Sequence, residues 1–78
     1  MNFNDLKTKL DSIGVNEQTY CLGGDFGDEQ YCLEKINHRW RYYYSERGQK
    51  MGERLFDNES DACEYMYSIL ENDPTVMF

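Results

Sequence analysis

Apolar residues near the start of the chain recur with the period of an α-helix. Four of them are separated by steps of 3, 4 and 3 positions, which places them on one side of a helix. They are Phe3, Leu6, Leu10 and Ile13. Asn2 or Asn4 can cap the start of such a helix, and Gly14 supplies the left-handed residue that commonly follows its end. The pattern therefore predicts a helix over residues 4–13.

The middle of the chain changes to short runs of Tyr and Leu that turn-forming residues separate. These turns are expected at 23–28, at Asn37-His38 and at 48–52. Short connections favour pairing of consecutive strands in antiparallel fashion. We therefore predict a four-stranded antiparallel β-meander. Its strands are expected at 18–23, 30–36, 39–46 and 52–57.

The third of these strands alternates between two faces. Trp40, Tyr42 and Tyr44 point to one face, while two arginines and Tyr43 point to the other. Such alternation is typical of a sheet that is covered on one side only. We expect Trp40, Tyr42 and Tyr44 to contribute to the core.

A second helical pattern follows the sheet and extends over residues 59–72. Its apolar stripe consists of Ala62, Met66, Ile69 and Leu70. Asn58, Ser60 or Asp61 can cap its start, and Pro74 marks its end. A chain of 78 residues has room for a single core. We therefore predict one α+β domain, residues 1–78, in which both helices cover the same face of the sheet.

The charge of the chain narrows its possible partners. The formal net charge is −7, which argues against nucleic acid and anionic membranes as partners, because phosphate-binding domains carry clustered positive charge. The segment 57–78 holds six carboxylates and no Lys or Arg. A folded surface of one sign attracts the opposite sign, so we expect a basic protein partner.

Neither a secretory signal nor a run of 18 apolar residues is found, which predicts a cytoplasmic chain. We also expect the chain to be monomeric when it is not bound to its partner. An odd number of cysteines fits reduced thiols in that compartment. Cys21 and Cys32 are equidistant from the middle of the predicted hairpin, so we expect them side by side on one face. The spacing leaves open whether they oxidise to a disulfide.

Metal sites and catalysis find little support in the residue spacing. Three Cys and one His lack the short C-x₂₋₄-C spacing of a zinc site. Asp57, Glu59 and Asp61 resemble the start of a calcium loop, but its required Gly and its bidentate Glu are missing. His38 lies in a predicted turn with no nucleophile at a recognised spacing. We therefore predict no cofactor, no metal and no enzymatic activity.

Partner binding is assigned to the acidic residues of the second helix and of the first hairpin. On the helix, Glu64 and Glu71 flank Tyr67 at helical spacing, an arrangement in which an aromatic ring fills a pocket while charges steer the partner. The full predicted set is Asp57, Glu59, Asp61, Glu64, Tyr67 and Glu71, extended by Asp25, Asp28 and Glu29 at the hairpin tip. The alternative interpretation is that this helix face is simply solvated.

Residues 40–70 contain a tryptophan strand, a Ser-Glu-Arg-Gly turn, a short strand that ends in Phe-Asp, and an acidic, aromatic helix with Ala-Cys inside. This arrangement resembles small bacterial immunity proteins of polymorphic toxin systems. It implies an α+β inhibitor that blocks a cognate toxin, often a basic nuclease, by direct binding. It transfers no contact residue to this chain.

Three hypotheses therefore stand. The first is an immunity protein that neutralises a basic toxin. The alternative is an acidic DNA mimic, although six of the eight bases fall between Lys35 and Arg54 and interrupt a phosphate-like array of carboxylates. A small enzyme or a metal-binding redox protein is the third hypothesis, and it would depend on the three cysteines.

Overall fold

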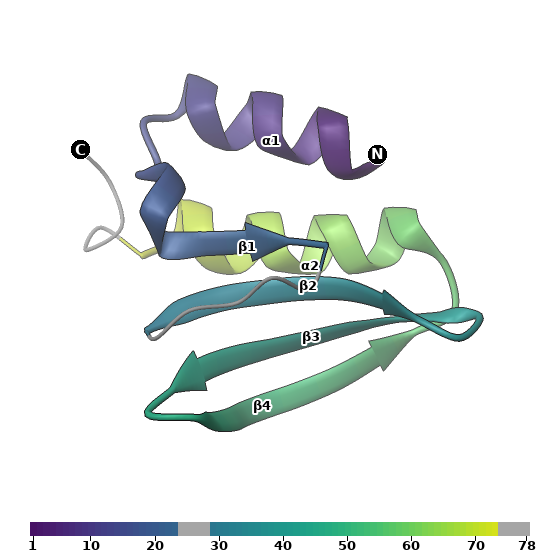
Figure 1. Cartoon of the computed structure of the whole chain (residues 1–78). Helices are drawn as coiled ribbons and strands as arrows, with labels where there is room; N and C mark the ends of the chain where they lie inside the picture. The colour runs from purple at the N-terminus through teal and green to yellow at the C-terminus, as the bar shows by residue number, and fades with distance from the viewer. Residues whose placement is uncertain (24–28, 74–78) are drawn as a thin grey trace.

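The computed structural model describes residues 1–23 and 29–73, and its elements follow the predicted order. Two helices, one 3₁₀ turn and four strands form a single α+β unit (Figure 1). The elements are α1 (Phe3–Ser12), η1 (Glu17–Thr19), β1 (Tyr20–Leu22), β2 (Gln30–Ile36), β3 (Arg39–Glu46), β4 (Gln49–Phe56) and α2 (Glu59–Glu71).

Local capping chemistry fixes where the first helix begins. The Asn2 side chain accepts a hydrogen bond of 2.8 Å from the Asp5 backbone N–H, and the Asp5 carboxylate accepts one of 3.3 Å from the Asn2 backbone N–H. This reciprocal pair satisfies two N–H groups that no helix carbonyl can reach. After the helix, Gly14 adopts φ +85°, the left-handed conformation expected from the sequence.

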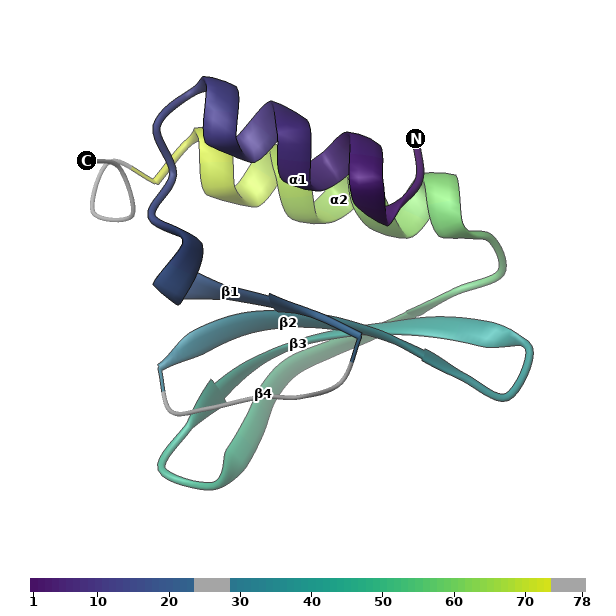
Figure 2. The same cartoon turned by 45° about the horizontal axis from the view of Figure 1, so that its top comes forward.

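Both helices lie on one face of the sheet, as predicted. Figure 2 shows α1 and α2 side by side above the strands, running in the same direction. Helix α2 contacts β2, β3 and β4, and α1 packs against α2. The apolar stripes of both helices meet Leu33 and Tyr42 of the sheet in one core. Its buried members are Leu6, Leu10, Val15, Tyr20, Leu33, Tyr42, Ala62, Cys63, Met66 and Leu70.

The sheet order β1-β2-β3-β4 agrees with a meander, but the predicted direction of the first strand is wrong. β1 pairs with β2 in parallel, whereas the β2–β3 and β3–β4 pairs are antiparallel. The segment after α1 brings the chain to the end of the sheet where β2 begins. There, Gln30 Nε2 donates a hydrogen bond of 3.0 Å to the Gln18 carbonyl. From that point β1 can only follow the direction of β2 (Figure 1).

Tyr43 overturns the expectation of a sheet buried on one side only. Its side chain points away from the helices, yet it is fully buried in a second cluster with Cys21 and Cys32. The two cysteines are register partners, so they do lie side by side, across parallel rather than antiparallel strands. All three cysteines of the chain are thiols, without a disulfide.

The aromatic residues on the helix side of β3 are buried to different degrees. Tyr42 is in the core, as expected, and its ring meets that of Tyr65 edge-on at 5.0 Å. Trp40 is only partly buried against the core. Tyr44 is half-buried and lies against Tyr31, with 4.8 Å between the ring centroids. Burial of these aromatic side chains therefore decreases from Tyr42 toward both ends of the strand.

Two leucines of the sheet test this division between core and surface. Leu33→Ala should lower the free energy of unfolding by about 2–5 kcal/mol, because Leu33 is fully buried and its removal leaves a cavity. Leu55→Ala, the matched control at a half-exposed site, should cost less than about 1 kcal/mol. Urea unfolding followed by circular dichroism measures both. Equal losses would contradict the assigned core.

Candidate functional site

The acidic residues that the sequence groups together have different roles in the structure. Asp57, which follows β4, is 88% exposed, and its Oδ1 lies 3.5 Å from Nε of Arg39, a side chain that is itself 60% exposed. Water competes strongly for both partners of such a pair, so it contributes little to stability. Asp57 therefore remains accessible, but its charge is partly matched.

Glu59 and Asp61 stabilise the beginnings of the two helices. Glu59 Oε2 accepts a hydrogen bond of 2.8 Å from the backbone N–H of Phe3, the first residue of α1. Asp61 at the start of α2 accepts a bond of 3.1 Å from Asn58 Nδ2, while Asn58 Oδ1 accepts one of 2.7 Å from the Asp61 backbone N–H. A carboxylate at a helix start satisfies unpaired N–H groups and complements the helix dipole. The carboxylates of Glu59 and Asp61 therefore have a structural role in capping the helices.

Glu64 and Glu71 remain as the exposed carboxylates on α2, together with a half-buried Tyr67. The sequence did not indicate that Lys9 of α1 belongs to the same surface, where its Nζ lies 5.6 Å from the Tyr67 ring centroid. A shallow hollow between the two helices is lined by Met1, Asp5, Thr8, Lys9 and Glu64. We call Asp5, Glu64, Tyr67 and Glu71 the acidic helix surface.

Of the three acidic residues predicted at the hairpin tip, Glu29 is the one among the described residues. Glu29 is exposed and adopts φ +56°, immediately before β2. It lies at the end of the sheet where the Tyr31 hydroxyl donates a hydrogen bond of 3.0 Å to Asp73, just beyond α2. Glu29 and Glu71 therefore occupy the same end of the molecule. Asp25 and Asp28, like the predicted helix stop at residue 74, lie outside the described residues.

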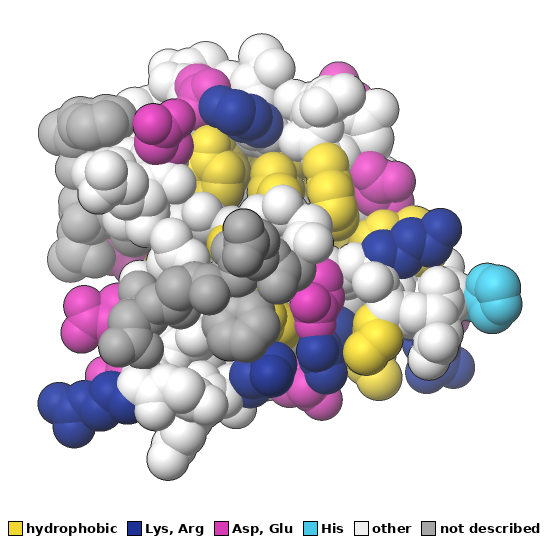
Figure 3. Space-filling view, in the orientation of Figure 1, with side chains coloured by type: hydrophobic (Ala, Val, Ile, Leu, Met, Phe, Trp, Pro, Cys, Tyr) yellow, Lys and Arg dark blue, Asp and Glu magenta, His cyan; other side chains and the backbone are white. Residues whose placement is uncertain are grey.

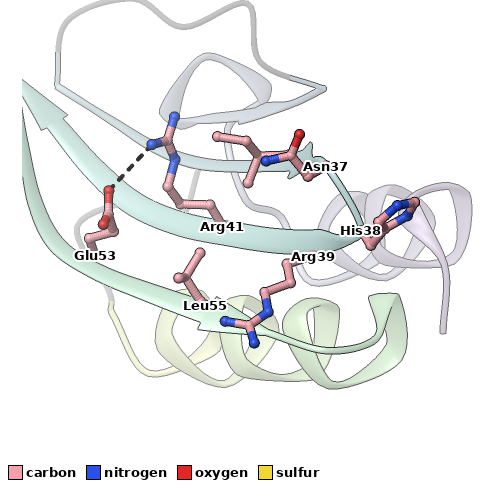
Figure 4. A pocket seen from close by; sticks show the side chains of 7 residues that line it. Asn37, His38, Arg39, Arg41, Glu53 and Leu55 are labelled. Carbon is pink, nitrogen blue, oxygen red and sulfur yellow. Dashed lines mark hydrogen bonds and ion pairs between the residues drawn. The ribbon is translucent and has the colours of Figure 1, made fainter.

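A second surface lies on the face of the sheet that the helices leave uncovered, and the sequence interpretation missed it. It is an open hollow of about 400 Å³ at the β2–β3 turn and along β4 (Figure 4). Two apolar side chains, Ile36 and Leu55, are 37% and 50% exposed beside it. We call it the sheet hollow, and its lining residues are Ile36, Asn37, His38, Arg39, Arg41, Glu53 and Leu55.

Arg41 anchors one side of the sheet hollow. Its guanidinium is paired with Glu34, with an Nε–Oε1 distance of 2.9 Å, and its Nη1 lies 3.5 Å from Glu53 Oε2. The guanidinium also lies over the Tyr43 ring, 5.3 Å from its centroid. The hydrogen bond to Glu34 raises the pKa of Arg41 further above neutral pH. Arg41 is therefore held in place, whereas Arg39 is held only by its exposed pair.

Formal charge differs between the strands and α2. Residues 30–56, which span β2–β4, contain six basic and three acidic side chains, a formal charge of +3. Two of the basic side chains, Lys35 and Arg54, lie on the helix side of the sheet, over the rings of Trp40 and Tyr65. The segment 57–78, which includes α2, carries −6. In Figure 3, dark blue side chains lie over the strands with magenta side chains among them, and another dark blue group lies over the helices. The six basic residues between Lys35 and Arg54 are the sequence signal for this second surface.

Two of the three cysteine thiols lie in surroundings that favour their protonated form. Burial raises the pKa of the Cys32 thiol to about 12 and that of Cys63 to about 11, which disfavours the reactive thiolate near neutral pH. Within residues 1–23 and 29–73, no three His, Cys, Asp or Glu side chains come together as metal ligands. None of the helices in those ranges is long and apolar enough to cross a membrane.

Comparison of the chain with protein-family models, with curated proteins and with solved structures finds no match. Function must therefore be inferred from these two surfaces.

The helix-capping role of Glu59 can be separated from a binding role. Glu59→Ala should lower the free energy of unfolding by about 0.5–2 kcal/mol, because the Phe3 N–H loses its acceptor. Glu71→Ala removes an exposed carboxylate near the carboxyl end of α2, where the helix dipole disfavours negative charge, and should change stability by less than about 0.5 kcal/mol. Thermal unfolding of both variants provides the measurement. A loss for Glu71→Ala as large as that for Glu59→Ala would contradict this assignment.

Proposed function

We propose that the chain is an immunity-type inhibitor that binds a basic toxin domain through the acidic helix surface. The observation that carries the proposal is the state of Glu64 and Glu71. Both are exposed, and neither makes a hydrogen bond or ion pair with the described part of the chain, whereas Asp57, Glu59 and Asp61 do. Carboxylates that stabilise no contact within the fold are available to a partner.

The geometry of α2 suits recognition of a cationic surface. Glu64 and Glu71 are seven residues apart, two helical turns, which places them about 10 Å apart along one side of the helix. Tyr67 lies between them and presents a partly exposed ring. Two like charges beside an aromatic ring can pair with basic side chains while the ring supplies apolar contact area. A net charge of −7 would also accelerate the encounter with a basic partner.

The surface is mounted on a rigid support. The opposite side of α2 carries Ala62, Cys63, Met66 and Leu70, all fully buried. Because these side chains fix the helix against α1 and the sheet, the exposed carboxylates need no rearrangement of the backbone before binding. A preorganised surface loses less conformational entropy on association. This supports inhibition by surface contact rather than by folding on the partner.

A genetic and a binding experiment together test the proposal. The product of the gene immediately upstream is expected to arrest bacterial growth, and co-expression of this chain should restore it. The double variant Glu64→Gln/Glu71→Gln should weaken binding to that product by about tenfold or more at low salt, because two steering charges are lost. Isothermal titration calorimetry measures the affinity. The complex of the unmodified chain should weaken as the salt concentration rises.

The matched control removes the same charge elsewhere. Glu17→Gln/Glu46→Gln leaves the same net charge as the test variant but alters no residue of the acidic helix surface, and it should bind as the unmodified chain does. Equal weakening by both variants would mean that only net charge matters and would remove α2 from consideration. Competition with DNA for many unrelated DNA-binding proteins would replace the proposal by the DNA-mimic alternative.

A further inference from the structure

Two of the three cysteines form a pair on the face of the sheet that the helices leave uncovered. Cys21 in β1 and Cys32 in β2 are register partners on neighbouring strands, so their side chains point to the same face. Neighbouring strands lie about 4.8 Å apart, within the range of about 4.4–6.8 Å that the Cα atoms of disulfide-bonded cysteines span. Both side chains belong to one buried cluster with Tyr43. The backbone therefore already places the two thiols where a disulfide between them can form.

Hydrogen bonds on both sides of the cysteine pair hold it in register. Before the pair, Gln30 Nε2 donates a hydrogen bond of 3.0 Å to the Gln18 carbonyl. After it, the backbone N–H of Gly23 donates one of 2.9 Å to the Leu33 carbonyl. β1 nevertheless has three residues and, in the described sheet, β2 as its one neighbour. A short strand at the edge of a sheet moves at low cost in free energy, so it can bring the two sulfurs from contact to bonding distance.

The two sulfurs of the pair interact directly. Burial raises the pKa of the Cys32 thiol to about 12, and the neighbouring Cys21 adds to this rise through charge repulsion and a side-chain hydrogen bond. The third thiol, Cys63, lies on α2 in the separate core on the helix side, so the sheet stands between it and the pair. Of the three cysteines, the fold therefore brings together Cys21 and Cys32 alone.

Access from solvent differs between the two members of the pair. Cys21 is 8% exposed, whereas Cys32 is fully buried. A small oxidant such as hydrogen peroxide therefore meets Cys21 first. The raised pKa of Cys32 also disfavours its thiolate, which is the form that reacts with peroxide. Exposure and protonation together make Cys21 the attacking thiol and Cys32 the resolving thiol.

We infer that Cys21 and Cys32 are a peroxide-sensitive thiol pair that closes to a reversible disulfide and clamps β1 onto β2. The inference goes beyond the proposed function, because it needs neither the acidic helix surface nor a partner protein. It also gives a role to a cluster on the opposite face of the sheet from the helices.

The reaction balances with hydrogen peroxide as the oxidant. Cys21 loses its proton, its sulfur attacks one peroxide oxygen, and the O–O bond breaks. The departing hydroxide takes up the proton and leaves as water. The Cys32 sulfur then attacks the sulfur of the Cys21 sulfenic acid, the S–O bond breaks, and the hydroxide leaves as a second water with the Cys32 proton. The two thiols lose two electrons, and one peroxide gains them.

Peptide mapping tests the inference, because trypsin separates the pair from the third cysteine. Cleavage after Lys and Arg leaves both members of the pair in peptide 10–35 and Cys63 in peptide 55–78. The full chain is treated with hydrogen peroxide, its remaining thiols are blocked with N-ethylmaleimide in denaturant, and the unreduced digest is analysed by mass spectrometry. Peptide 10–35 should lose two hydrogen atoms, and dithiothreitol should restore them, whereas Cys63 should carry the block. A cross-link between the two peptides, or a block on both members of the pair, would overturn the inference.

Two single variants test the order of the two steps. In Cys32→Ser the resolving thiol is missing, so the sulfenic acid of Cys21 should persist and react with dimedone. In Cys21→Ser the buried Cys32 should take up at most about one tenth as much dimedone in the same time, because it is shielded from the oxidant. Circular dichroism checks that both variants are folded, and the peptide map of the unmodified chain decides the matter if either is not. Equal labelling of the two folded variants would contradict the assigned roles.

Thermal unfolding measures whether the disulfide acts as a clamp. A bond that closes the segment 21–32 restricts the unfolded chain, so the oxidised protein should unfold about 5 °C or more above the reduced protein. Dithiothreitol should remove this difference, and Cys32→Ser treated with the same peroxide should not show it. An unchanged or lower unfolding temperature of the oxidised chain would mean that the bond strains the fold, and it would contradict the clamp.

Discussion

The burial of helix α2 between the sheet and α1 is the contact on which the fold depends. Ala62, Met66 and Leu70 are fully buried within a core that also contains Leu6 and Leu10 of α1 and Leu33 and Tyr42 of the sheet. A chain of this length gains its stability from a single cluster of this kind. Two sides of α2 are thereby committed to packing, and one side remains for solvent and partners. The position of Glu64 and Glu71 on that side follows from the apolar stripe opposite them.

The sequence predicts the helices and the two middle strands well because their signals are local, but the turn predicted at 48–52 is wrong, since β4 already begins at Gln49. Periodicity and capping residues place α1 and α2 within one or two residues of their observed ends. The direction of β1, in contrast, cannot be predicted from local signals. An antiparallel hairpin and a parallel pair both put Cys21 opposite Cys32 and point the same side chains toward the helices, so alternation cannot distinguish them. Direction is decided by where the loop after α1 delivers the chain, which is a non-local constraint. The burial of Tyr43 beside both cysteines has the same origin.

The candidate site was predictable only in part, because charge in the sequence does not reveal how a charge is used. Glu59 lies 56 residues from the N–H that it accepts from, so no spacing rule connects it with Phe3. Lys9 reaches Tyr67 only because two helices distant in the sequence pack together. The sheet hollow likewise requires Ile36 and Leu55 to be brought together across β3. Local patterns identified which residues are polar, and tertiary contacts determined which of them remain available.

The two surfaces differ in how firmly the fold holds their charged groups. On α2, Glu64 and Glu71 are attached to a packed helix and form no ion pair within the described chain, so they present a negative field, with Lys9 of α1 beside it. At the sheet hollow, Arg41 pairs with Glu34 and Glu53, and the exposed Arg39 pairs with Asp57, so each of these basic side chains has an acidic partner. Long-range attraction is therefore expected mainly from the helix layer, whereas the sheet layer can discriminate only at contact, through shape and apolar area.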